Sequence, residues 1–147
     1  NLGSSFRFDY TMIGDTTNLA SRLESLNKYL GTQILISEAV REQLKDKFIT
    51  RRLGEFRVAG KAHSVSIHEL LGRCEAASAE RAWIDAFEAG LDVFRAGEFS
   101  KATDLMNRTC DLRGGSDGPA QFYLRKIVIL RGQDLKNWNG IIELSEK

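Results

Sequence analysis

Hydrophobic residues at the start of the chain predict a short strand followed by an amphipathic helix. The strand covers residues 7–13 and ends at Gly14, and Asp15 or Thr16 is a suitable N-cap for the helix. Glycine is common directly after the last turn of a helix, so Gly31 predicts where this helix ends. Within the helix, leucines recur at helical spacing and predict one buried face: Leu19, Leu23, Leu26 and Leu30.

The rest of the first half predicts strands and one more short helix. Ser37 caps this helix, and Val40 and Leu44 lie on its inner face. The longest predicted strand is interrupted at Gly54, and it is predicted to form a hairpin with the strand that follows it. The predicted ranges are 33–36, 48–58 and 65–70 for the strands and 38–44 for the helix. This order of strands and helices predicts an α+β or α/β unit.

The character of the sequence changes after Gly72. Residues 73–80 are polar and rich in alanine, as in a linker. Two amphipathic helices follow, marked by Trp83, Phe87, Leu91 and Phe94, and then by Phe99, Ala102, Leu105 and Met106. A glycine-rich loop over residues 114–119 precedes a third helix, residues 122–130. The tail that follows is apolar at Trp138, Ile141 and Ile142.

The chain therefore divides into a first unit, residues 1–72, and a helical extension, residues 73–147. The first two helices of the extension cross at small residues, as in a tetratricopeptide-like repeat: Ala86, Gly90, Gly97 and Ala102. One such pair cannot bury both of its faces, since these folds stack three or more repeats. We expect the pair either to pack on the first unit and cap it, or to bind a peptide.

Composition is that of an ordinary globular protein. Of the 147 residues, 42% are hydrophobic and 28% are charged, and the net charge is +1. This balance gives no argument for nucleic acid or an acidic membrane surface, and no apolar run could span a bilayer. Cys74 and Cys110 lack a CxxC spacing, which favours reduced thiols and a cytoplasmic location. His63 and His68 are too isolated to predict a metal site.

The strongest chemical signal lies in residues 7–24, which read RFDYTMIGDTTNLASRLE. Asn18 and Arg22 are four residues apart in the first predicted helix, so they share a face. A guanidinium beside a carboxamide near a helix N-terminus suits a polyanion, and Thr11 adds a hydroxyl for a base edge. On the residues alone, the simpler interpretation is an exposed asparagine and arginine on a solvated helix.

This run resembles the R-x-D-Y-T-x-x-G-x-x-x-N-x-A-x-R-L signature of class III adenylate and guanylate cyclases. It fills the specified positions without a gap, and the similarity continues through residues 31–37 and 58–70. The resemblance therefore covers about residues 1–72. It implies an α+β fold in which this unit is the C-terminal half of a ferredoxin-like cyclase catalytic domain.

The resemblance implies a role for each of four residues. Thr11 falls where the family contacts the purine base, and Asn18 falls where it orients the ribose. Arg22 matches the arginine that stabilises the pentavalent phosphorus while the ribose 3′-oxygen attacks the α-phosphate. The triphosphate-binding lysine of the family falls on Ala59 here, and Lys61, two residues further on, is the candidate substitute.

The resemblance also implies two Mg²⁺ or Mn²⁺ ions, whose aspartate ligands in the family precede this motif. Asp9 belongs to the strand signature and Asp15 to the helix cap, so neither is such a ligand. Active sites of the family lie between two catalytic domains, with the metal aspartates on one and the asparagine and arginine on the other. We therefore expect a homodimer, and we expect this chain alone to bind no metal pair and to be inactive.

A weaker resemblance concerns the extension. A helix pair followed by residues 117–119 and then by Trp138 and Gly140 resembles the C-terminal region of bacterial cyclases joined to membrane-bound sensors. It implies a piece of a longer bacterial protein, with the missing residues all N-terminal and the parent anchored in a membrane. We predict that the parent is an adenylate cyclase acting on ATP. The alternatives are a guanylate cyclase acting on GTP, and a degenerate cyclase domain that dimerises or senses nucleotides.

The first unit, taken as half of a catalytic domain, should leave a sheet edge and a helix face uncovered. Such surfaces tend to pair with another chain. We therefore expect the chain to self-associate, or to cover these surfaces with its helical extension.

Overall fold

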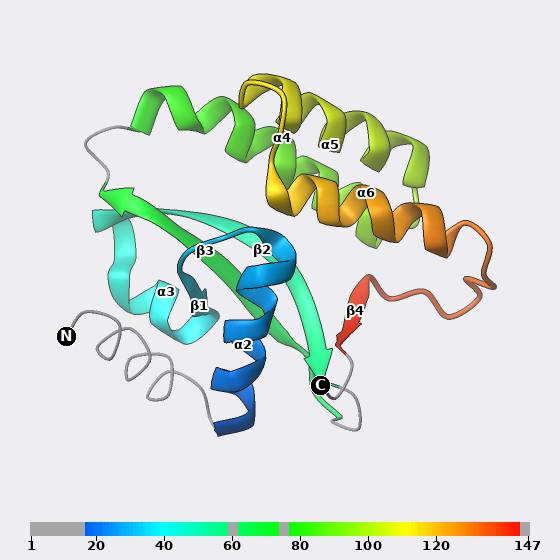
Figure 1. Cartoon of the computed structure of the whole chain (residues 1–147), viewed down its shortest axis with the longest axis horizontal. Helices are drawn as coiled ribbons and strands as arrows, with labels where there is room; N and C mark the ends of the chain where they lie inside the picture. The colour runs from blue at the N-terminus through cyan, green and yellow to red at the C-terminus, as the bar shows by residue number, and fades with distance from the viewer. Residues whose placement is uncertain (1–16, 59–61, 74–76, 145–147) are drawn as a thin grey trace.

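The structure, a computed structural model, describes residues 17–58, 62–73 and 77–144, with the backbone alone at residues 17–23, 58 and 77–79. The helices are α2 (Thr17–Leu30), α3 (Glu38–Leu44), the 3₁₀ turn η1 (Lys45–Lys47), α4 (Ala77–Arg95), α5 (Phe99–Leu112) and α6 (Gly118–Leu130). The strands are β1 (Leu35–Ser37), β2 (Phe48–Val58), β3 (Val65–Arg73) and β4 (Ile141–Leu144). The described strands form one mixed sheet in the order β1-β3-β2-β4 (Figure 1).

The predicted end of α2 and the predicted start of α3 are both found in the structure. Gly31 has a φ of 70°, and its N–H donates to the carbonyl of Asn27, which closes the last turn of α2. The hydroxyl of Ser37 accepts from the N–H of Val40 at 3.4 Å and caps α3. Val40 and Leu44, the residues predicted for its inner face, are half-buried, and no residue of α3 is fully buried.

The predicted hairpin is confirmed as the antiparallel pair β2–β3. Its register shifts between Arg52 and Gly54, and Gly54 has a φ of 128°. An extra residue in one strand of a pair is a β-bulge, which bends the strand and frees backbone groups from the ladder. The interruption predicted at Gly54 is therefore a bulge within one continuous strand.

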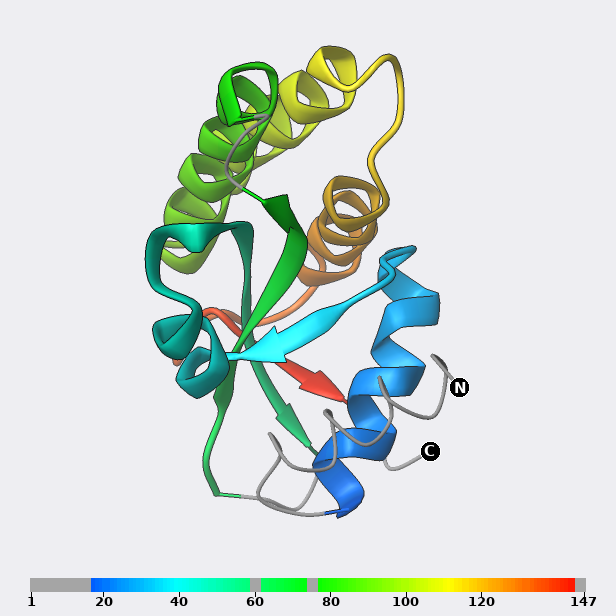
Figure 2. The same ribbon diagram turned by 90° about the vertical axis from the view of Figure 1, so that its left-hand side faces the viewer.

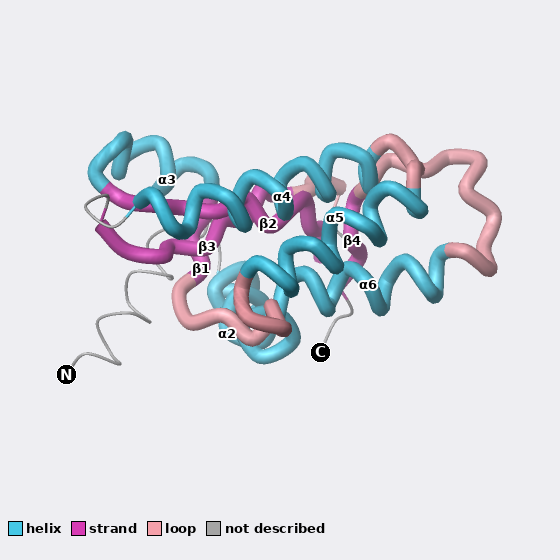
Figure 3. The backbone as a smooth tube through the Cα atoms, turned by 90° about the horizontal axis from the view of Figure 1, so that it is seen from above, coloured by secondary structure: helices cyan, strands magenta, loops and turns pink. Residues whose placement is uncertain are grey.

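The helices of the extension lie along one side of the sheet, above it in Figure 1, while α3 lies below. Seen from above, α4 runs along the strands and α5 and α6 lie beside it (Figure 3). The side chains predicted for the inner faces of α4 and α5 are buried, apart from the half-buried Leu105. No helix in the part of the chain that the structure describes is both long and apolar enough to cross a membrane.

Two features of the extension differ from the prediction. Helix α6 begins at Gly118 rather than at Phe122, because Asp117 accepts from the N–H of Ala120 at 2.9 Å and Pro119 suits a first helical turn. The tail forms a strand, β4, which pairs in parallel with residues 55–58 of β2. A tail strand that joins the sheet of the first unit was not predicted.

A single large hydrophobic cluster joins the two halves of the chain. It includes residues of the first unit (Leu26, Leu30, Leu35, Leu53, Phe56 and Ile67) and of the extension (Phe87, Phe94, Met106, Phe122, Tyr123 and Ile142). Of the two outcomes expected for the uncovered surfaces, the structure thus has the second, with the extension covering one side of the sheet. A tetratricopeptide-like character of the α4–α5 pair stays a prediction.

Candidate functional site

Helix α2 carries two of the four residues with predicted roles. Asn18 and Arg22 lie one turn apart in its first half. Thr11 and Lys61 lie outside the described residues. The structure thus describes the backbone of Asn18 and Arg22, one turn apart on α2, and the roles of the four residues stay predictions.

The opposite end of α2 is held firmly. Leu26 and Leu30 are buried in the large hydrophobic cluster, whereas Tyr29 is 64% exposed. The carbonyl of Asn27 accepts from the N–H groups of Gly31 and Thr32 at 2.8 and 3.1 Å. The helix is therefore anchored at its C-terminal end, and Arg22 precedes the anchor residue Leu26 by a single turn.

A buried ionic cluster joins the hairpin to the helices above it. Arg51, on β2, is fully buried, and its Nε and Nη2 donate to Glu69 Oε1 on β3 at 3.0 and 2.6 Å. Its Nη1 donates to Asp117 Oδ2, at the start of α6, at 2.9 Å. The guanidinium also lies 4.8 Å from the ring centroid of Trp83 and 4.6 Å from that of Phe87, both on α4. One side chain thus ties together both strands of the hairpin and two helices.

Asp117 is the second centre of this cluster. Its Oδ1 accepts from Arg113 Nη1 at 2.7 Å, while its Oδ2 accepts from Arg51 and from the N–H of Ala120. Burial opposes ionisation of this carboxyl, but the hydrogen bonds and charges of Arg51 and Arg113 outweigh it and hold the pKa of Asp117 below its usual range. The cluster is therefore charged and balanced, with two guanidinium groups facing the carboxylates of Asp117 and Glu69.

The helices also supply partners for the backbone at the bulge of β2. The N–H of Arg52 donates to Glu88 Oε2 on α4 at 2.9 Å. The carbonyl of Leu53 accepts from the hydroxyl of Tyr123 on α6 at 2.6 Å. Burial raises the pKa of Tyr123, so its hydroxyl stays protonated and remains a donor. The extension thus satisfies backbone groups that the sheet leaves free, and sequence reasoning gave no sign of this.

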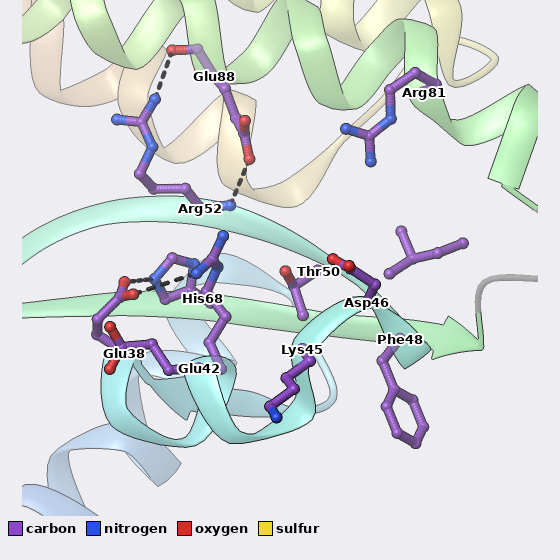
Figure 4. A pocket seen from close by; sticks show the side chains of 12 residues that line it. Glu38, Glu42, Lys45, Asp46, Phe48, Thr50, Arg52, His68, Arg81 and Glu88 are labelled. Carbon is purple, nitrogen blue, oxygen red and sulfur yellow. Dashed lines mark hydrogen bonds and ion pairs between the residues drawn. The ribbon is translucent and has the colours of Figure 1, made fainter.

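An open groove of about 740 Å³ lies between α3, β2 and α4 (Figure 4). Charged side chains of both signs line it: Glu38, Glu42, Lys45, Arg52, Arg81 and Glu88. At the groove His68, on β3, is 3% exposed, and its Nε2 lies 2.6 Å from Glu38 Oε1. Its Nδ1 is buried without a hydrogen-bond partner within the described part of the chain.

Burial of His68 should make the stability of the fold depend on pH. Burial lowers the pKa of His68, and the hydrogen bond and charge of Glu38 only partly oppose this. A depressed pKa means that the unfolded chain takes up a proton before the folded chain does. The contribution of His68 to the free energy of unfolding is thus fully present above its ordinary pKa, near 6.5. This contribution is lost as the pH falls through the lower pKa that His68 has in the folded chain.

We therefore expect urea unfolding of the 147-residue chain to show a lower midpoint at pH 5.5 than at pH 7.5. The variant His68→Gln should show a smaller difference between the midpoints at the two pH values, because a glutamine side chain does not titrate. His63 is exposed, so His63→Gln is a matched control that should keep the wild-type difference. An unchanged difference in His68→Gln would contradict the prediction.

The described residues do not offer a metal site. Within the described ranges, no three His, Cys, Asp or Glu side chains are grouped so that they could hold a metal ion. The Mg²⁺ or Mn²⁺ ions that the resemblance implies therefore do not fit any described part of the chain.

Residues of the first unit match one family model and several curated proteins. A family model described as "Adenylate and Guanylate cyclase catalytic domain" matches residues 2–72. Adenylate cyclase 1 of Rhizobium meliloti (strain 1021) is 43% identical over 72 residues, which cover 49% of this chain and 11% of that protein. The adenylate cyclase of Anabaena cylindrica is 40% identical over 72 residues, covering 47% of this chain and 14% of that protein.

A more distant match extends beyond the first unit. The terminal-differentiation specific adenylate cyclase of Dictyostelium discoideum is 25% identical over 132 residues, covering 86% of this chain and 6% of that protein. A match of this length must run past residue 72 into the extension. The chain spans between 6% and 14% of the length of these three relatives. No solved structure matches the chain significantly.

Proposed function

We propose that the protein carrying this chain is a bacterial adenylate cyclase, because the family model described as "Adenylate and Guanylate cyclase catalytic domain" matches residues 2–72. It converts ATP to cyclic AMP and pyrophosphate in signal transduction. The observation that carries the proposal is the run Arg7–Leu23 with Asn18 and Arg22 one turn apart on α2. The names of the relatives, all adenylate cyclases, favour ATP over GTP.

In this reaction the ribose 3′-oxygen loses its proton and forms a bond to the α-phosphorus, while the bond from that phosphorus to pyrophosphate breaks. Arg22 donates to α-phosphate oxygens whose negative charge grows in the transition state. Asn18 hydrogen-bonds the ribose, and along the helix axis it lies about 6 Å from Arg22. Thr11 contacts the adenine edge, and Lys61 binds the triphosphate. These residues form one side of a site between two chains.

The proposed protein is a homodimer with its catalytic domains in the cytoplasm and an N-terminal sensor that controls them. The metal-binding aspartates would come from the partner chain, and the Mg²⁺ or Mn²⁺ ions held there would offset negative charge on the triphosphate. Family sites built between two domains support this arrangement. The 147-residue chain alone is therefore inactive.

The test is an assay of the purified full-length protein with ATP and with GTP, each with Mg²⁺ or Mn²⁺. We expect cyclic AMP to form faster than cyclic GMP. Faster formation of cyclic GMP would identify a guanylate cyclase. No cyclic nucleotide under any of these conditions would favour a degenerate domain that dimerises or senses nucleotides. The 147-residue chain, assayed in parallel, is the inactive control.

A further inference from the structure

The C-terminal end of α2 touches the N-terminal end of α6, backbone against backbone. A Cβ added at Gly118 would overlap the carbonyl oxygen of Leu30, and it would lie 3.0 Å from the Leu30 carbonyl carbon and 3.3 Å from Gly31 Cα. These contacts involve main-chain atoms, which cannot move aside as a flexible side chain can. Figure 2 shows the start of α6 directly above the lighter blue end of α2. Only a glycine fits at this position of α6.

The start of α6 cannot easily move away from this contact. Asp117, next to Gly118, is buried and bonds to Arg51, to Arg113 and to the N–H of Ala120. Arg51 is itself fully buried and belongs to the hairpin of the first unit. The first turn of α6 is therefore fixed to the sheet by charged hydrogen bonds, which are about twice as strong as neutral ones.

The contact between Leu30 and Gly118 affects the position of Asn18 and Arg22, because all of α2 is one continuous helix. Arg22 lies eight residues before Leu30, which is about 12 Å along a helix at 1.5 Å per residue. Leu26 and Leu30 belong to the same hydrophobic cluster as Ala120 and Phe122 of α6. A shift at the Leu30 end must therefore tilt or slide the segment that carries Asn18 and Arg22.

We propose that Asp117 and Gly118 are positioning residues for nucleotide cyclisation: through the Leu30 contact, the start of α6 sets where α2 presents Arg22. This inference rests on the proposed function. It gives the extension a defined part in the reaction, although neither residue touches the nucleotide. Because Arg22 acts on charge that develops in the transition state, a misplaced α2 should lower kcat and leave KM nearly unchanged.

The test compares two glycine-to-alanine variants of the full-length protein. Gly118→Ala forces the Leu30 contact apart, and we expect kcat to fall about tenfold or more, since a misplacement of about 1 Å can cost a hundred-fold. KM should stay within about twofold, as for a group that acts only in the transition state. Gly132→Ala is the matched control, because a Cβ there meets only the Ile129 carbonyl oxygen, at 3.8 Å. It should keep the wild-type kcat. Equal kcat values for the two variants would overturn the proposal.

Two further measurements cover the other outcomes. If Gly118→Ala does not fold, Asp117→Asn, which keeps an oxygen to cap α6 but loses the charge, takes its place. A lower kcat at unchanged KM in Asp117→Asn supports the proposal, and an unchanged kcat overturns it.

If the wild type makes no cyclic nucleotide, the proposed function fails, and amide exchange of α2 in the 147-residue chain decides instead. Faster exchange in Gly118→Ala than in Gly132→Ala supports the positioning role, and equal exchange overturns it.

Discussion

Replacing Arg22 with alanine should lower the turnover number of the full-length protein by a hundred-fold or more, while nucleotide binding changes less. Preorganised charge aimed at oxygens that become more negative in the transition state is commonly worth about 3–4 kcal/mol. A group that acts mainly in the transition state affects kcat more than KM. The measurement is kcat and KM for ATP with Mg²⁺ and with Mn²⁺, at a temperature where the variant is folded.

Two further variants test whether the effect of Arg22→Ala is specific to this guanidinium group. Arg22→Lys keeps the positive charge but loses the planar pair of donors, so we expect it to recover only part of the lost activity. Arg108→Ala removes an exposed arginine of α5 and should leave kcat unchanged. A higher KM at an unchanged kcat in Arg22→Ala would show that Arg22 binds the nucleotide without stabilising the transition state.

The local structure of the chain could be predicted well because its signals are local. Leucine spacing and Gly31 predict α2, and Ser37 predicts the start of α3. Residues 65–70 are predicted to be the second strand of the hairpin, which is β3, and Gly54 predicts a break in β2. Each of these signals lies within a few residues of the feature that it predicts.

Features that depend on distant partners could not be predicted. Ile141 and Ile142 form a strand only because β2, far earlier in the chain, offers an edge. Arg51 looks like a solvent-facing strand residue until Asp117, 66 positions later, is placed beside it. The start of α6 was missed for a different reason. Residues 114–119 have the composition of a loop, although Asp117 and Pro119 are also typical of a helix start.

In the candidate site, too, local features could be predicted from the sequence, and contacts with distant residues could not. The four-residue spacing of Asn18 and Arg22 predicts a shared helix face, and α2 contains both residues. The contact of Leu30 with Gly118 has no sequence signal, because a glycine in a loop-like run does not reveal what lies against it. The motif therefore carries the family resemblance, whereas the tertiary structure indicates which other part of the chain holds α2 in place.

Replacing Arg51 with methionine should cost about 3–5 kcal/mol of unfolding free energy, because it leaves buried carboxylates without their cation. In the described part of the chain, Glu69 loses its only charged partner, and Asp117 keeps Arg113 and the N–H of Ala120. Total stabilities are about 5–15 kcal/mol, so the variant should unfold at a much lower urea concentration than the wild type. The measurement is urea unfolding of the 147-residue chain at pH 7.5.

The same substitution at a partly exposed arginine of β2 tests whether the loss of stability comes from burial or from the loss of any positive charge. Arg57 lies on the same strand and pairs with Glu143 at the surface, so Arg57→Met should unfold close to the wild-type midpoint. Adding Glu69→Gln to Arg51→Met removes one orphaned charge and should restore part of the loss. Equal midpoints for Arg51→Met and Arg57→Met would mean that the buried cluster does not hold the extension to the hairpin. The coupling of α6 to α2 would then depend on hydrophobic packing alone.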